Sequence, residues 1–167
     1  MEFSRPVPLA RIGFERFRQE IAATEAECAA LAKRFDLVVL DRLTAIVELE
    51  REPEDTILLR ARFAATFSQS CVVTLDPVAG EVAEEFTLRY GMIEAEPDAV
   101  EDDSGEGPAF EPLTGDAIDV GEAVAQEFSL ALPPFPRCEG AIIEAEAEPA
   151  ADGPFAALAR LNPPPGS

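Results

Sequence analysis

Side chains that commonly carry out catalysis are scarce in this sequence. Its 167 residues include no histidine and one lysine, Lys33. Without histidine, neither a Ser-His or Cys-His nucleophile pair nor a His-ligated zinc, haem or iron centre can form. The three cysteines, Cys28, Cys71 and Cys138, make no CxxC metal pair, and their odd number is typical of a reducing compartment. These residues indicate a protein that is not an enzyme and uses no metal or cofactor.

Carboxylates are abundant, but their spacing is not that of a catalytic or metal-binding site. Glu84-Glu85 and the acidic triplet at residues 101–103 are runs of adjacent acids. An acid–base pair needs burial that separates two pKa values, and a calcium loop needs a wider, regular spacing. We interpret these runs as solvated surface charge.

Three arginines take solvent-facing positions on predicted strands: Arg60, Arg62 and Arg89. If their strands are neighbours, they form a small basic stripe that can contact RNA or another anion. The alternative, which we favour, is cross-strand pairing with Glu48, Glu50 or Glu85. The same two interpretations apply to a second basic group, which comprises Arg5, Arg11, Arg16 and Arg18.

The net charge is −20, from 33 acidic and 13 basic side chains, and it is unevenly distributed. Residues 1–62 are nearly neutral, whereas residues 63–167 carry almost all of the excess negative charge. A charge of this sign argues against broad neutralisation of nucleic-acid phosphates. The N-terminus has no signal-peptide pattern and no segment is long and apolar enough to span a membrane, so we expect a cytoplasmic protein.

Two segments are predicted to be amphipathic helices. In residues 24–35, Thr24 and Glu27 have the spacing of a capping box. Ile21 precedes this range, but we assign it to the apolar face of the same helix, because it and the later apolar residues recur at helical spacing. The second helix begins at the N-cap Asp119, with Glu122 three residues on, and ends at the prolines of residues 132–136.

Alternation of apolar and polar residues predicts strands at residues 43–50, 57–67 and 86–90. We expect a further strand at 71–75, with a turn or kink at 68–70 before it and a turn at 76–80 after it. Short connections favour an antiparallel meander with one buried face. The predicted fold class is therefore α+β.

The rest of the chain is acidic or rich in proline, alanine and glutamate. Residues 94–111 hold eight acids and no base, which predicts a mobile acidic loop. Residues 141–167 are predicted to be a flexible tail, which leaves residues 1–140 as a single domain. The acidic segment 94–119 could alternatively bind a basic partner protein.

Three segments, at residues 22–37, 67–78 and 116–137, resemble the YceD-like family, known as large ribosomal RNA subunit accumulation proteins. One family motif is Q-x-C-V-x-T-L-[DE]-P. The other begins I-D-x-[GL]-E and ends, after a helix, in S-L-x-L-P-x-x-P. Carried over by position, the motifs fall on Gln69, Cys71, Thr74, Leu75, Asp76, Pro77, Asp119, Glu122, Leu132, Pro133 and Pro136.

The resemblance implies a non-enzymatic role in the accumulation or processing of large-subunit ribosomal RNA during ribosome biogenesis. The implied partner is that RNA, or a ribosomal or assembly protein. Many relatives carry CxxC pairs after the proline motif, but here only Cys138 remains. A metal role is therefore not expected, and the motif residues are open to either a structural or a binding role.

Overall fold

The computed structural model describes residues 2–53, 56–92 and 108–142. In chain order, its elements are β1 (Pro6–Pro8), a short 3-10 helix (Leu9–Arg11), β2 (Phe17–Ala22), α1 (Glu25–Arg34), β3 (Val39–Arg51), β4 (Ile57–Ser70), β5 (Pro77–Gly91), β6 (Ala109–Pro112), β7 (Ala117–Asp119) and α2 (Val120–Ala131). One sheet has the order β2-β3-β4-β5-β6, and β1 pairs with β7 in a second. All pairings are antiparallel except β5–β6. The α+β class and the antiparallel meander are confirmed.

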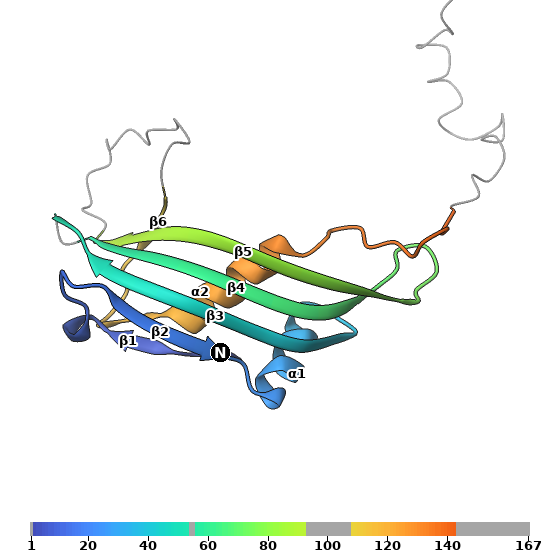
Figure 1. The fold of residues 1–167 in the computed structure, drawn as a ribbon, viewed down its shortest axis with the longest axis horizontal. Coiled ribbons are helices and arrows are strands. Elements are labelled where there is room, and N and C mark those ends of the chain that lie inside the picture. Colours follow the sequence, from blue (N-terminus) through green and yellow to red (C-terminus); the bar gives the residue numbers. More distant parts are fainter. Residues whose placement is uncertain (1, 54–55, 93–107, 143–167) are drawn as a thin grey trace, which may run out of the picture.

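The long strands β3, β4 and β5 form because their side chains alternate between two environments. Along β4, Ala61, Phe63 and Ala65 are buried, whereas Arg60 and Arg62, which alternate with them, are exposed. One face of the sheet therefore packs against α2, which lies across it in Figure 1. We call the opposite face the outer face.

Helix α2 supplies the centre of the core. Val120, Val124 and Phe128 form its buried stripe, and each is 0% exposed. The Phe128 ring makes edge contacts with Phe63 and Phe67 of β4, at centroid distances of 6.4 and 5.7 Å. Such aromatic pairs are worth about 0.5–1.5 kcal/mol each beyond the burial of their area. These contacts fix α2 on the middle of the sheet.

Helix α1 begins as the sequence predicts. The Thr24 hydroxyl accepts the Glu27 backbone N–H at 3.3 Å, and the Glu27 carboxylate accepts the Thr24 backbone N–H at 2.8 Å. The placement of Ile21 on this helix was wrong, because Ile21 lies in β2, opposite Ala45 of β3. Ile21 is buried because it lies in the sheet and not on the helix. The sequence did not predict β2.

The largest correction concerns residues 68–80. Residues 68–70 continue β4 without a turn, residues 71–76 form the β4–β5 loop, and Pro77 already begins β5. The predicted strand at 71–75 and turn at 76–80 are therefore both wrong. The loop closes through the Cys71 N–H and the Asp76 carbonyl at 2.8 Å, with Leu75 at a left-handed φ of 66°.

Most of the predicted acidic loop lies outside the described residues, as does nearly all of the predicted tail. At the end of the loop segment, Ala109–Pro112 form β6, which pairs with β5 from Leu88 to Gly91. The assignment of residues 1–140 to a single domain stays a prediction.

Candidate functional site

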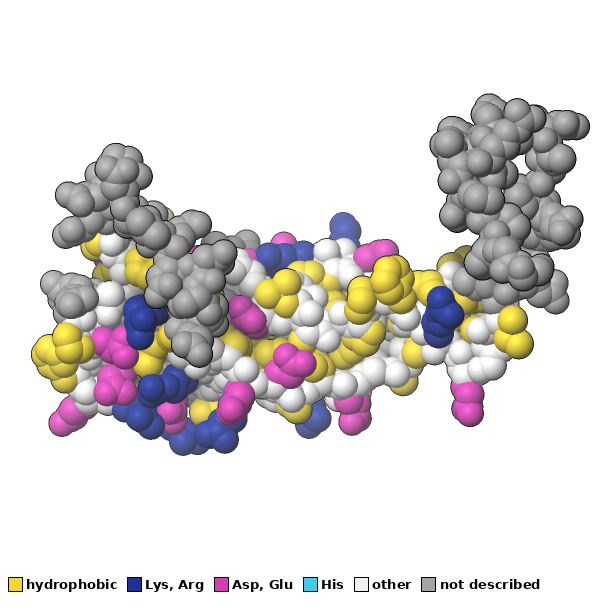
Figure 2. All heavy atoms as spheres, turned by 90° about the horizontal axis from the view of Figure 1, so that it is seen from above, with side chains coloured by type: hydrophobic (Ala, Val, Ile, Leu, Met, Phe, Trp, Pro, Cys, Tyr) yellow, Lys and Arg dark blue, Asp and Glu magenta, His cyan; other side chains and the backbone are white. Residues whose placement is uncertain are grey.

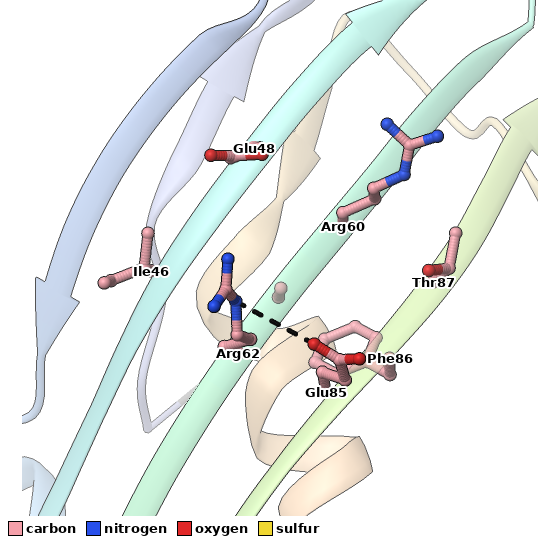
Figure 3. A pocket seen from close by; sticks show the side chains of 8 residues that line it. Ile46, Glu48, Arg60, Arg62, Glu85, Phe86 and Thr87 are labelled. Carbon is pink, nitrogen blue, oxygen red and sulfur yellow. Dashed lines mark ion pairs between the residues drawn. The ribbon is translucent and has the colours of Figure 1, made fainter.

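The outer face of the sheet brings Arg60, Arg62 and Arg89 to one side of two adjacent strands. In the β4–β5 register, Arg62 lies opposite Glu85, and Arg89 lies opposite Leu58, two residues before Arg60. A shallow hollow of about 420 Å³ lies on this face, and Arg60, Arg62, Glu85 and Thr87 contribute to its lining (Figure 3). The alternation in the sequence thus located three arginines that share one surface.

Each of these arginines has a carboxylate neighbour. Arg62 Nε lies 3.9 Å from Glu85 Oε2, and both side chains are more than three-quarters exposed. Figure 3 shows Arg62 directed toward Glu85 across the strand boundary. The separation is close to the outer limit for an ion pair, and an exposed pair contributes about 0–1 kcal/mol.

The other two pairs differ in strength. Arg60 Nη1 lies 3.9 Å from Glu50 of β3, another weak, exposed contact. Arg89 Nε donates to Glu52 Oε2 at 3.0 Å, a closer and less exposed interaction. Glu52 was not among the partners expected from the sequence, because it lies on the connection that follows β3.

Two further arginines extend the charge pattern to the edge of the sheet. Arg16 and Arg18 lie 3.3 and 3.5 Å from the Glu48 carboxylate of β3. Arginines at the start of β2 and on β4 therefore flank the glutamates of β3. Figure 2, which views the molecule from the side of β5 and β6, shows a group of basic side chains near one end with acidic side chains beside them. The outer face has many guanidinium groups but no large net positive charge.

The remaining two members of the second basic group have structural contacts. Arg5 Nη1 and Nη2 donate to the two oxygens of Glu27 at 2.7 and 2.9 Å. This hydrogen-bonded pair, together with the Thr24 N–H, lowers the pKa of Glu27 to about 2. Arg11 stacks over the Phe17 ring at 5.1 Å. Arg5 therefore ties the N-terminal segment to α1.

The motif residues of the β4–β5 loop surround the Cys71 sulfur. Cys71 is 0% exposed, and its Sγ accepts backbone N–H groups of Val73 and Thr74, both at 3.4 Å. A third N–H, from Cys138, approaches at 3.3 Å. The Thr74 side chain and these N–H groups favour the thiolate and lower the pKa of Cys71 to about 6. These donors therefore favour the thiolate form of Cys71.

The proline motif after α2 docks on this loop. The Gln69 side-chain amide donates to the Pro133 carbonyl at 3.2 Å, and the Val72 N–H donates to the Pro136 carbonyl at 2.9 Å. Next to these contacts, Leu75 and Phe135 are 77% and 75% exposed. Two motifs more than 60 residues apart thus meet at one end of the sheet.

Asp119 and Glu122 lie at the other end of α2, which at 12 residues is about 18 Å long. Asp119 Oδ1 accepts the N–H groups of Gly121 and Glu122 at 3.1 Å and that of Arg5 at 2.7 Å. Glu122 forms a two-point pair with the Arg34 guanidinium at 2.7 and 2.9 Å. Both acids therefore have contacts that hold α2 against the N-terminal segment and α1.

The described part of the chain contains neither a buried carboxylate pair nor a cluster of metal ligands. Within residues 2–53, 56–92 and 108–142, no Asp, Glu, Lys or Arg residue is buried, and no three potential ligands come together to hold a metal ion. Hydrolysis by a buried carboxylate pair therefore gains no support. None of the described helices has the length and apolar character needed to cross a membrane.

The fold and the site define a small α+β protein that presents a mixed-charge sheet face and a loop built around a cysteine. Comparison with known families gives a match to the family described as "Large ribosomal RNA subunit accumulation protein YceD", over residues 59–161. This chain belongs to the YceD family. The match includes the second and third resembling segments and leaves out residues 22–37. No curated protein and no solved structure gives a significant match.

Proposed function

We propose that this chain is a non-enzymatic factor in the accumulation of large-subunit ribosomal RNA, and that it contacts RNA phosphates through the arginines of the outer face. The family's description links it to large-subunit ribosomal RNA. The observation that carries the proposal is the placement of Arg60 and Arg62 on a sheet face that no described helix covers, each in a weak, exposed ion pair. We place this activity in the cytoplasm.

The weak pairs make exchange with a phosphate feasible. An exposed Arg–Glu pair contributes about 0–1 kcal/mol, whereas a guanidinium forms two parallel hydrogen bonds to a phosphate. Arg60 and Arg62 are therefore the arginines best placed to change partner. Arg89, at 3.0 Å from Glu52, is held more firmly.

The overall charge limits the size of the contact. With a net charge of −20, the chain repels a polyanion at long range, so only a few local phosphate contacts can form. Three such contacts give a slope of log Kd against log salt of about 2 to 3, because each releases close to one counterion. The expected interaction is weak, local and salt-sensitive.

The test compares two double charge reversals with the same change in net charge. Arg60→Glu with Arg62→Glu removes two proposed contacts. Lys33→Glu with Arg137→Glu reverses two exposed charges away from the outer face. Binding to fragments of large-subunit ribosomal RNA is measured by fluorescence anisotropy between 50 and 200 mM salt.

We expect the outer-face variant to lose most of its RNA binding. The slope of its log Kd against log salt should fall by about 1.5. The control variant should stay close to the unmodified chain. Equal losses in both variants would show a response to net charge alone, and unchanged binding in the outer-face variant would exclude these arginines.

A second candidate function is that of an acidic adaptor that binds a basic partner protein through residues 94–119. The supporting observation is that Glu127 of α2 lies near other acids: burial, Glu111 of β6 and Glu84 of β5 together raise the pKa of Glu127. The variant Glu84→Gln with Glu111→Gln is predicted to lose a basic ribosomal protein in a low-salt pull-down. The arginine reversals at the outer face should leave that interaction intact.

A further inference from the structure

The two cysteines at the end of the sheet lie close together although 67 positions separate them. The Cys71 Sγ is 3.3 Å from the Cys138 nitrogen, which places the Cys138 Cα within about 4.8 Å of that sulfur, given the N–Cα bond length. The Thr74 backbone N–H donates to the Cys71 sulfur at 3.4 Å, and the Thr74 hydroxyl lies 3.6 Å from the Cys138 sulfur. Both sulfurs therefore contact Thr74.

The two thiols differ in their access to solvent. Cys71 is fully buried and surrounded by N–H donors, whereas Cys138 is partly exposed. The Thr74 side chain and the N–H groups around Cys71 lower its pKa to about 6 and so favour the thiolate form. An external oxidant can thus reach Cys138, while Cys71 is positioned to react only with an internal neighbour.

We propose that Cys71 and Cys138 form a reversible disulfide when the protein meets a small-molecule disulfide such as glutathione disulfide. This joins the β4–β5 loop covalently to the segment after α2. The hydrogen bonds already described at Gln69 and Val72 hold the same two segments together, so bond formation needs little movement of the backbone. Cys28 takes no part, because it lies on the buried face of α1 with a raised pKa.

The reaction proceeds by two thiol–disulfide exchanges. The Cys138 thiolate attacks one glutathione sulfur, so a Cys138–glutathione bond forms, the glutathione S–S bond breaks, and one glutathione leaves and takes up a proton. The Cys71 thiolate then attacks the Cys138 sulfur and releases the second glutathione. The two cysteines lose two electrons and two protons, and the glutathione disulfide is reduced to two thiols.

The test uses the full chain, reduced, freed of metal with a chelator and incubated with glutathione disulfide. Intact-mass measurement should show a loss of about 2 Da with no retained glutathione, because two hydrogens leave. Peptide mapping should then give a linked Cys71–Cys138 pair and a free Cys28. In the variant Cys71→Ser, the exchange should stop at one glutathione on Cys138. The matched control Cys28→Ser should behave as the unmodified chain does.

Several results would overturn the proposal. A stable glutathione adduct on Cys138 of the unmodified chain would show that Cys71 cannot reach it. A linkage that includes Cys28, or a disulfide between two chains, would show that the juxtaposition is not used. The mapping of the unmodified chain decides the question even if Cys71→Ser fails to fold.

Discussion

Neutralising the carboxylates that pair with Arg60 and Arg62 should strengthen RNA binding. The change is Glu50→Gln with Glu85→Gln, which leaves both arginines in place and removes their ion-pair partners; it also removes the contact between Glu50 and Arg16, at 3.7 Å. A loss of binding on arginine reversal has many explanations, whereas a gain on removing a specific pair of acids has few. This variant therefore tests the idea that the arginines exchange partners.

The expected magnitude follows from the geometry of the two pairs. Both have a closest N–O distance of 3.9 Å, and the Arg62–Glu85 pair is more than three-quarters exposed. A value of about 0.5 kcal/mol per pair is appropriate for such contacts. Two pairs give about 1 kcal/mol, which corresponds to about a fivefold lower Kd.

The assay is fluorescence anisotropy at fixed salt with a fragment of large-subunit ribosomal RNA. The control is Glu25→Gln with Glu139→Gln, which makes the same change in net charge at two exposed positions away from the outer face. A long-range effect of net charge lowers Kd in both variants, so the difference between them measures the local effect. If the two variants gain equally, or if the outer-face variant gains nothing, the exchange argument fails.

Three further predictions concern stability. Phe128→Ala should lower the free energy of unfolding by about 3–5 kcal/mol in urea titrations, whereas Phe14→Ala, at a 75%-exposed side chain, should have little effect. Gly121→Ala should destabilise by about 1–3 kcal/mol in the same assay, because the added Cβ meets the backbone of residues 3–5. Glu27→Gln should cost up to about 1 kcal/mol at pH 7 through the lost pair with Arg5. Since the folded pKa of Glu27 is depressed to about 2, this cost is present above the unfolded value near 4.5 and should disappear as pH falls from about 5 to 2; a cost that persists at pH 2 would contradict this.

The sequence predicted the elements whose signals are local. The capping box at Thr24 and the N-cap at Asp119 depend on side chains within three residues of the helix start, and both are present. Regular alternation located the faces of β3 and β4, and with them the arginines of the outer face. These features need no knowledge of distant contacts.

The misassigned segment depends on contacts that a local pattern does not contain. Val72, Val73 and Thr74 are β-branched and resemble a strand, but their N–H groups go to the Pro136 carbonyl and to the Cys71 sulfur. The chain turns there because a single sulfur accepts several N–H groups and because the proline segment packs back on the loop. Neither interaction has a spacing that sequence reasoning could detect.

The site was predicted only in part for the same reason. Strand alternation shows which arginines share a face, but not the path of the connection that brings Glu52 to Arg89. The contact between Cys71 and Cys138 likewise depends on how the chain leaves α2. A cysteine in each of the two motif regions was the available signal, although a sequence alone does not give their distance.

The most direct test of the central claim is the level of large-subunit ribosomal RNA, relative to small-subunit RNA, in cells that lack this chain. We expect a lowered ratio that is restored by the unmodified chain and by the control Lys33→Glu with Arg137→Glu. The variant Arg60→Glu with Arg62→Glu should fail to restore it at equal protein abundance. A normal ratio in cells without the chain would contradict the proposed function, and full restoration by the arginine variant would contradict the proposed surface.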